Sequence, residues 1–358
     1  MEYRIFRPGL DDSEVLRLRA AVWGKAHPHT DAAFFNWLYQ QNPAGIGSGI
    51  LMTDEGQTVG FAGLSPKKME CVGRTINVAH GLDYMVHPNI RSGAGSYRVA
   101  SAWVMHAREA GFQAGMVFPN DASIKVLTSR KIGFKAVFSP MLMVRLVSGF
   151  TAPAVNSSRL RSLLAKAGGR TLATLNCLHA ALRSVRDSDG HAFDIGEFDA
   201  SFDEFWERAR DQQGISILKN AAYLNWRYNN HPIYRYTKIG WRRASELCGF
   251  VILSRRNLMD MDTMMIVDIL TRDKSPRSMC SLIAEAVTHA RQQGCSVVAT
   301  LAIGGSEQYM ALKKMGFIAI PKRFDPKSFT LAAVDFNEKY SCAPIDKWRF
   351  DWGYMDVV

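Results

Sequence analysis

The amino-acid sequence predicts a duplicated α/β fold, in which two copies of one mixed sheet with flanking helices follow each other along the chain. Three observations support this prediction. The chain has 358 residues, more than one compact core usually holds, since domains average roughly 150 residues. Short motifs recur in the same order in both halves. Within each half, strand-like segments are interspersed with segments of helical periodicity.

The recurring motifs keep nearly constant spacing. The segment NWLYQQNP begins at Asn36 and NWRYNNHP begins at Asn225, an offset of 189 residues (225 − 36). Four further matches follow at similar offsets: Gly60 with Gly249, Asp83 with Asp268, Ala107 with Ala290, and Gly133 with Gly316. Because matches in one consistent order are not expected by chance, both halves descend from one ancestral domain.

Each copy is predicted to contain the same elements. In the first copy, we expect helices at about 12–25, 31–41, 95–110 and 121–131, and strands at about 48–53, 58–66 and 75–87, after Gly111 and from Phe134. In the second copy, we expect helices at about 201–211, 220–228 and 277–293, and strands at about 248–254, 262–270 and 296–302. The predicted domains are 1–150 and 191–358. The basic, turn-rich and amphipathic segment 151–190 is predicted to be a helical linker.

The composition indicates a soluble, cytoplasmic protein. Hydrophobic residues make up 47% and charged residues 22%, as in ordinary globular domains. No apolar run reaches the length of a membrane helix, and the charged N-terminal segment does not resemble a secretory signal. The six cysteines are scattered without a CxxC pair, which favours reduced thiols over disulfides or a zinc site.

The net charge of +11 favours anionic partners, such as a phosphate-rich cofactor, a phosphorylated substrate or nucleic acid. The chain contains no run of five Lys or Arg residues and no RNA-binding aromatic motif. These absences argue against nucleic acid and leave a phosphate-bearing small molecule as the favoured partner.

The loop after Pro88 carries the strongest chemical signal. A strand ending at Val86 is followed by Arg91-Ser92-Gly93-Ala94-Gly95-Ser96, which leads directly into a helix. Small residues let a ligand approach the backbone, and the N–H groups at a helix start favour an anion such as pyrophosphate. The glycine spacing fits neither a P-loop nor a dinucleotide fingerprint. The alternative is an ordinary helix cap.

This segment resembles the GNAT superfamily of N-acetyltransferases, in which a strand, a Pro and an Arg/Gln-x-x-Gly-x-Gly/Ala segment precede a helix that holds the CoA pyrophosphate. Counted from Pro88, Arg91 takes the Arg position, whereas Ala94 and Ser96 take the small-residue positions. The resemblance implies two tandem GNAT-like domains, each with a mostly antiparallel sheet, and acetyl-CoA or another acyl-CoA as co-substrate without a metal. The implied acyl-CoA contacts are Met85, Val86, Arg91, Ser92, Gly93, Ala94, Gly95, Ser96 and Asn120.

The segment FPNDASIKVLTSRKIGFK resembles a second GNAT element, in which an Asn precedes a helix that ends in Gly-Phe. By this resemblance, Asn120 contacts the pantetheine arm of CoA; the alternative is that it caps the helix. The family often places a Tyr in this helix as general acid for the thiolate, and this sequence has none. Ser129, Thr128 or water remains to supply the proton, and we take Ser129 as the candidate.

A general base should lie on the strand at 75–87, because that strand faces the thioester in the resembled fold. Strand alternation places Asp83 and Met85 on one face, and His80 and Tyr84 on the other. Asp83 is the first candidate base and His80 the second, and for each the alternative is a structural hydrogen bond. The backbone of Met85 and Val86 would pair with pantetheine as an added strand and polarise the thioester carbonyl.

The second copy lacks the small-residue loop and the Pro-Asn segment of the first. Its corresponding loop carries Pro276, which removes an amide donor, and Gly304-Gly305 replace the Pro-Asn pair. We therefore expect the second half not to bind CoA, and either to shape the acceptor pocket or to be structural. The paired motifs around Trp37 and Trp226 are expected to pack in a core or to contact the acceptor.

These observations predict an acyl-CoA-dependent N-acyltransferase, in which a small-molecule amine attacks the thioester directly. One alternative is an aminoacyl-tRNA-dependent transferase of the peptidoglycan-bridge type, which also pairs two such domains and suits the positive charge, although no coiled-coil arm is present. Another is a tandem GNAT protein that binds acyl-CoA without catalysis.

Overall fold

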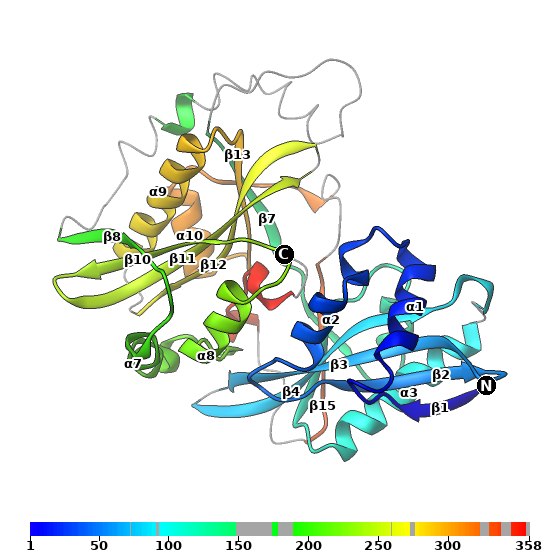
Figure 1. Cartoon of the computed structure of the whole chain (residues 1–358). Helices are drawn as coiled ribbons and strands as arrows, with labels where there is room; N and C mark the ends of the chain where they lie inside the picture. Colours follow the sequence, from blue (N-terminus) through cyan, green and yellow to red (C-terminus); the bar gives the residue numbers. More distant parts are fainter. Residues whose placement is uncertain are drawn as a thin grey trace. The chain divides into compact units, whose positions relative to one another are not determined.

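The structure is a computed structural model of the chain (Figure 1). It describes residues 1–71, 73–90, 93–147, 174–177, 189–258, 260–272, 276–322, 329–337 and 345–355. The chain forms two compact units, each assembled from separate stretches of sequence. Unit 1 comprises Met1–Ser139, Ile215–Ile233 and Ser328–Lys347, whereas unit 2 comprises Pro140–Gly214, Tyr234–Lys327 and Trp348–Val358. Within the residues described, no helix has the length and hydropathy needed to cross a membrane.

Unit 1 is built on a mixed sheet in which, among the described strands, only β4 and β5 pair in parallel. Its strands lie in the spatial order β1 (Glu2–Ile5), β2 (Ser48–Asp54), β3 (Gln57–Cys71), β4 (Arg74–Val86), β5 (Ala114–Val117), β15 (Leu331–Asp335) and β6 (Lys135–Phe138), and β9 (Ser216–Ile217) pairs with β3.

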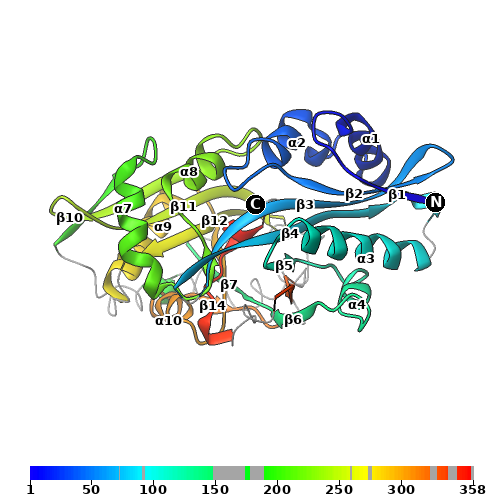
Figure 2. The ribbon, with the colours of Figure 1, turned by 90° about the horizontal axis from the view of Figure 1, so that it is seen from below.

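Helices cover both faces of the unit 1 sheet. Helices α1 (Asp12–Trp23) and α2 (Ala32–Tyr39) lie on one face and α3 (Gly93–Glu109) on the other (Figure 2). As the helical spacing predicts, Val99, Trp103 and Ala107 of α3 are buried against the sheet. The remaining elements of this unit are η1 (Pro28–Thr30), η2 (Pro88–Ile90), α4 (Ile124–Leu127), α8 (Ala221–Leu224), the π-helical turn η4 (Asn225–Asn229) and η7 (Ile345–Lys347).

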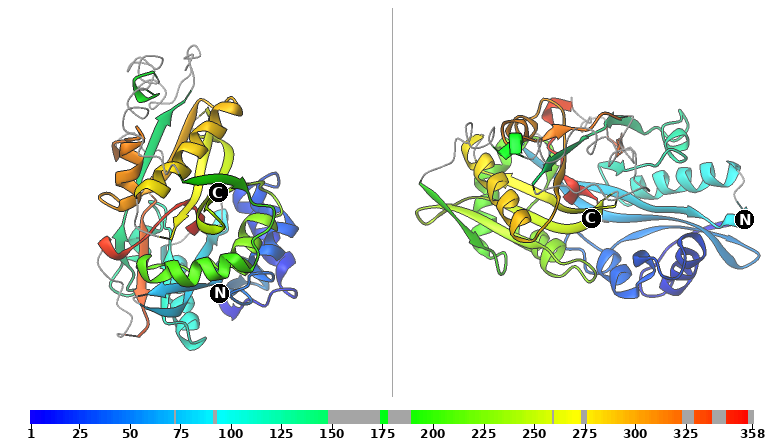
Figure 3. Two further views of the ribbon diagram at one scale, coloured as in Figure 1. Left: turned by 90° about the vertical axis from the view of Figure 1, so that its left-hand side faces the viewer. Right: turned by 90° about the horizontal axis from the view of Figure 1, so that it is seen from above.

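Unit 2 repeats this plan. Its strands lie in the order β8 (Gly190–Asp194), β10 (Thr237–Arg243), β11 (Glu246–Leu258), β12 (Met261–Thr271), β13 (Val297–Ala302), β7 (Met141–Leu146) and β14 (Ile318–Ala319). Of the strand pairs described in this unit, β12–β13 alone is parallel. Helix α9 (Pro276–Gln292) lies along the sheet (Figure 3) and, with α10 (Glu307–Lys314), supplies the core. Short helices α7 (Ala200–Ala209), η3 (Arg210–Gln212) and η8 (Trp352–Tyr354) complete the unit.

Each sheet contains strands from both halves of the sequence: β7 of the first half lies in the unit 2 sheet, and β15 and the short β9 of the second half lie in the unit 1 sheet. Strand β7 follows β6 directly in the chain but lies between β13 and β14, whereas β15 lies between β5 and β6. The predicted fold class, two mixed sheets flanked by helices, is confirmed. The predicted ranges 1–150 and 191–358 differ from the compact units because they treat each half as continuous. Most of the predicted linker, 151–190, falls outside the described residues.

The duplicated aromatic motifs contact each other reciprocally within unit 1. The indole Nε1 of Trp37 donates to the carbonyl of Trp226 at 2.9 Å, and Nε1 of Trp226 donates to the carbonyl of Trp37 at 3.1 Å. The two rings are buried and stacked, with centroids 4.4 Å apart and planes 10° from parallel. The tryptophans therefore pack in a core, the first of their two predicted roles.

Candidate active site

Strands β4 and β5 separate at the end of their shared ladder. Their parallel pairing runs from Val78 opposite Ala114 to Gly81 opposite Val117, where β5 ends. Strand β4 continues to Val86 and stays paired with β3 on its other side. Among the residues that the structure describes, the backbone of residues 82–86 consequently has no partner strand on the β5 side. An unpaired strand edge can bind an extended ligand through main-chain hydrogen bonds.

A β-bulge lies at this separation. Leu82 is opposite Gly63 and Met85 is opposite Phe61, so β4 contains one more residue than β3 over this stretch. Asp83, inside the bulge, has a φ of 52°, in the left-handed region. Aspartate is among the few residue types besides glycine that adopt this conformation with some regularity, although at a cost.

The bulge changes which side chains share a face, so the predicted alternation along β4 is wrong. Ala79 packs in the core beneath α3, and Tyr84 reaches the same helix. His80, which alternates with Ala79, and Asp83, which contacts α1 and α2, therefore lie on the opposite face together. The prediction separated these two candidate bases because it assumed a regular strand.

Asp83 is buried and held by two side chains that the sequence analysis did not identify. Arg19 of α1 forms an ion pair with Oδ2 of Asp83, and the Tyr39 hydroxyl of α2 donates to the same oxygen at 2.6 Å. Burial, together with the negative charge of Asp83, raises the pKa of Tyr39 well above its usual value, so this hydroxyl remains a donor. The available sequence signal was the position of Arg19, which has the helical spacing of the apolar residues Val15 and Leu18.

Glycines make room for the Tyr39 side chain. A Cβ at Gly63 would overlap the Tyr39 hydroxyl, and a Cβ at Gly47 would lie 2.6 Å from Cδ1 of its ring. The two glycines thus let the ring lie close to the β2–β3 backbone and reach β4.

Helix α3 follows β4 in the chain after the short helix η2. Of the predicted cradle, Arg91 and Ser92 lie outside the described residues, Gly93 and Ala94 open the helix, and Gly95 is buried in its first turn. The Ser96 carbonyl accepts a hydrogen bond from Tyr84 at 2.6 Å, and burial raises the pKa of Tyr84 to about 12. This bond ties β4 to a helix start whose first N–H groups have no intrahelical partner.

The segment after β5 shows Asn120 as a capping residue. Its Oδ1 accepts hydrogen bonds from the backbone N–H of Ala122 at 3.1 Å and of Ser123 at 2.9 Å. The helix that follows, α4, is shorter than the predicted 121–131 because the turn at Asn120 occupies its first residues. The proposed contact between Asn120 and pantetheine stays a prediction.

Ser129 differs from the neighbouring hydroxyls. Ser123 bonds to Asn120, and Thr128 donates to the Ile124 carbonyl at 2.7 Å. The Ser129 Oγ is buried and has no hydrogen-bond partner among the described residues. It is therefore the hydroxyl of this segment that retains an unused donor.

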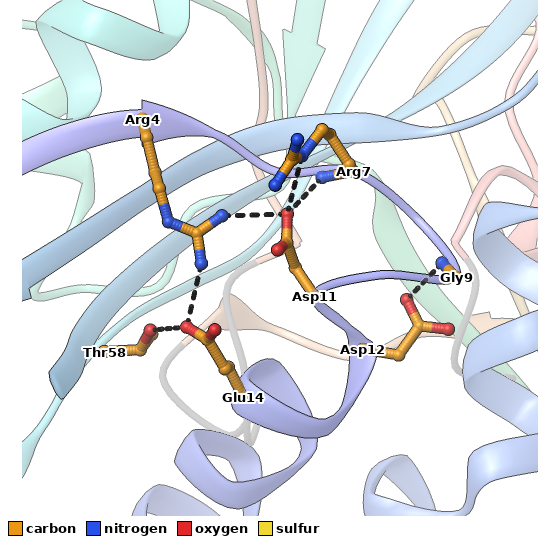
Figure 4. Close-up of polar contacts among 7 residues, drawn as sticks. All are labelled: Arg4, Arg7, Gly9, Asp11, Asp12, Glu14 and Thr58. Carbon is orange, nitrogen blue, oxygen red and sulfur yellow. Dashed lines mark hydrogen bonds and ion pairs between the residues drawn. The ribbon is translucent and has the colours of Figure 1, made fainter. Parts of the chain in front are cut away.

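A polar cluster anchors the helix that carries Arg19 (Figure 4). The guanidinium of Arg4 in β1 contacts Asp11 and Glu14, each at 2.9 Å, and Glu14 also accepts from Thr58 of β3. Although burial opposes it, hydrogen bonds from the Arg7 backbone and the Arg4 side chain lower the pKa of Asp11. The N-terminal end of α1 is thereby fixed to the sheet.

Known structures establish the fold. No protein-family model matches the chain, and no curated protein matches it. A GCN5-related N-acetyltransferase from Anabaena variabilis superposes with a TM-score of 0.65 at 10% identity, over 94% of this chain and 73% of that one. A tandem GNAT protein from the clavulanic acid biosynthesis pathway gives 0.57 at 11% identity, over 94% and 99% of the two chains. The chain has the tandem GNAT fold.

A third structure, a conserved protein of unknown function and probable N-acyltransferase from Enterococcus faecalis, has a TM-score of 0.61 at 11% identity. It matches over 94% of this chain and 73% of its own length. At such identities the similarity describes the fold and not the substrate. The two units of this chain are therefore compared with each other, residue by residue, at their strand separations.

The second GNAT unit fills its equivalent strand separation with its own side chains. The β12–β13 pairing ends with Met265 opposite Ala299, although β12 continues to Thr271. Carbonyls beyond this point accept hydrogen bonds from side chains of unit 2: Ile266 from Thr300 at 2.9 Å, Ile269 from Arg349, and Thr271 from Gln213 at 3.1 Å. These β12 carbonyls in the second unit thus already accept hydrogen bonds from its own side chains.

Proposed function

We propose that this protein is an acyl-CoA-dependent N-acyltransferase that binds acyl-CoA on unit 1 and acts in the cytoplasm. The observation that carries the proposal is the edge of β4 beyond Gly81, which no other described strand pairs with and which precedes η2 and the start of α3. Pantetheine needs backbone donors and acceptors along an extended path, and pyrophosphate needs N–H groups, so this edge and helix start suit both parts of CoA. The net charge of +11 suits the same ligand.

In this proposal, the backbone of Met85 and Val86 binds the pantetheine arm, and the amides of residues 93–96 bind the pyrophosphate. The contacts of Arg91 and Ser92, which lie outside the described residues, stay predictions from the sequence. Asn120 contacts the arm from the segment after β5. Because β4 and β5 are parallel neighbours, both segments emerge at the same edge of the sheet.

The reaction is direct transfer. The amine nitrogen attacks the thioester carbonyl carbon, the carbon–sulfur bond breaks, and the amine loses a proton as the amide forms. The proton acceptor is a β4 side chain, His80 or Asp83, and the departing thiolate receives a proton from Ser129. Ser129 suits this role because its buried hydroxyl has no other partner in the described part of the chain. A small-molecule amine is the proposed acceptor.

A second candidate is acyl-CoA binding without catalysis. It is favoured by the contacts of Asp83, because its Oδ2 already accepts hydrogen bonds from Arg19 and Tyr39. Turnover with a panel of amines, followed as release of the free CoA thiol, separates the two candidates. His80→Ala and Ser129→Ala should each lower the turnover number of an active enzyme.

Thermal shift tests the binding proposal. Acetyl-CoA or a longer acyl-CoA at about 100 times its Kd should stabilise the protein by about 2.7 kcal/mol. Gly95→Pro should abolish this response, because proline removes an amide in the first helical turn, a position at which the fold tolerates it. Gly304→Pro in unit 2 is the matched control and should respond as the unsubstituted protein does. No shift with any acyl-CoA would refute the proposal.

A further inference from the structure

The contacts around Asp83 converge on the backbone feature that separates β4 from β5. Asp83 is the bulge residue and has a left-handed φ of 52°. Its side chain is 4% exposed and is held from two different helices, by Arg19 and by Tyr39. A left-handed conformation is unfavourable for any residue with a Cβ unless the surroundings maintain it. The two side chains supply that constraint.

Arg19 is itself fixed on several sides. It is fully buried, its Nη1 donates to the His29 carbonyl at 2.6 Å, and its guanidinium lies 4.6 Å from the Phe35 ring centroid. One guanidinium therefore joins α1, the loop between α1 and α2, and the bulge. Any movement of the bulge would leave a buried charge without its counter-charge, which is strongly unfavourable.

We infer that Arg19 and Tyr39 are positioning residues that hold Asp83 in the left-handed bulge and so keep the β4 edge open for acyl-CoA. Asp83 then acts through the backbone that it fixes and not as the proton acceptor, which leaves His80 in that role. The same Oδ2 that a base would use is already occupied by two donors. The expected effects on kcat and KM rest on the proposed function. The expectation that Arg19 and Tyr39 fix the bulge does not.

The structural part is tested by hydrogen exchange on the ligand-free protein. Tyr39→Phe removes one anchor and keeps the ring, so the amides of residues 82–86 should exchange about fivefold to tenfold faster. Tyr309→Phe in unit 2 is the matched control and should leave them unchanged. Arg19→Met should give a larger increase, whereas Arg17→Met, an exposed neighbour on the same helix, should give none. Unchanged exchange in both test variants would overturn the inference, whether or not the protein binds CoA.

The catalytic part is tested with a series at Asp83. Asp83→Asn keeps an acceptor oxygen and tolerates the left-handed conformation, but it cannot act as a base. Asp83→Gly tolerates the left-handed conformation but has no side chain for Arg19 and Tyr39 to contact. Asp83→Ala loses these contacts and also disfavours the left-handed conformation. A positioning role predicts that Asn retains kcat within about tenfold, that Ala raises KM for acyl-CoA the most, and that Gly lies between them.

The opposite pattern would overturn the assignment. If Asp83 is the base, the Asn, Gly and Ala variants should lose kcat equally with KM for acyl-CoA unchanged, and Tyr39→Phe should not alter KM. Should Asp83→Asn fail to fold because Arg19 keeps its charge, the double variant Arg19→Met/Asp83→Asn removes both charges. That variant should retain a measurable kcat if Asp83 is a positioning residue and none if it is the base.

Discussion

Replacing Trp37 by phenylalanine tests the reciprocal contact between the duplicated motifs. The substitution removes the indole N–H, which leaves the buried Trp226 carbonyl without its donor at a cost of about 1–3 kcal/mol. It also removes part of a closely stacked pair, whose geometry contributes about 0.5–1.5 kcal/mol beyond burial. The free energy of unfolding should therefore fall by about 1.5–4.5 kcal/mol.

The symmetry of the contact sharpens this prediction. Trp226→Phe removes the mirror-image hydrogen bond and the same stack, so its cost should agree within about 1 kcal/mol. Because the residues touch, the double variant should cost less than the two single costs together, by about 0.5–3 kcal/mol. Trp23→Phe, at a half-buried position on α1, is the control and should cost under about 1 kcal/mol.

Urea unfolding followed by far-UV circular dichroism measures these costs, provided that the slope of the transition is the same for all variants. Both tryptophans belong to unit 1, so the loss should appear in the transition of that unit. A large cost for Trp37→Phe with almost none for Trp226→Phe would refute the argument, because a reciprocal contact cannot be essential from one side alone.

Three further predictions concern the whole chain. Fragments 1–150 and 191–358 should each be unfolded alone and should fold when co-expressed, as judged by circular dichroism, because each sheet needs β7 or β15 from the other fragment. Calorimetry should give one acyl-CoA per chain, and two would contradict the filled separation in unit 2. Burial lowers the pKa of His106, so the unfolded state binds more protons near and below the usual histidine pKa and stability falls as the pH drops through that range. The difference in unfolding free energy between pH 7.5 and pH 5 should therefore be smaller in His106→Gln.

The fold class could be predicted from the sequence because the same motifs recur in both halves of the chain. Equivalent residues such as Trp37 and Trp226 recur in order, and the structure brings this pair into direct contact. Helical spacing likewise predicted the helix at about 95–110, which the structure contains as α3. The partner of each strand was not predictable in the same way. The apolar segment that forms β7 has the pattern of a strand, but its own residues do not specify which of the two sheets it joins.

Within the candidate site, the sequence located β4 and the start of α3 but misjudged the geometry between them. A period of two residues holds only for a regular strand, and the extra residue at Asp83 interrupts it. Arg19 and Tyr39 were missed because they are 64 and 44 residues from Asp83 in the chain, and no short motif joins them. The roles of His80, Asp83 and Ser129 stay predictions.

The exchanged strands have a consequence for how the two halves can evolve. A substitution that weakens β7 damages the sheet of unit 2 although it arises in the first half of the gene, and β15 has the converse effect. The halves are therefore free to diverge around their strand separations, where side chains of unit 2 donate to the β12 carbonyls, but not in stability. A half that no longer binds a ligand cannot be deleted, since its partner would lose an interior strand with it.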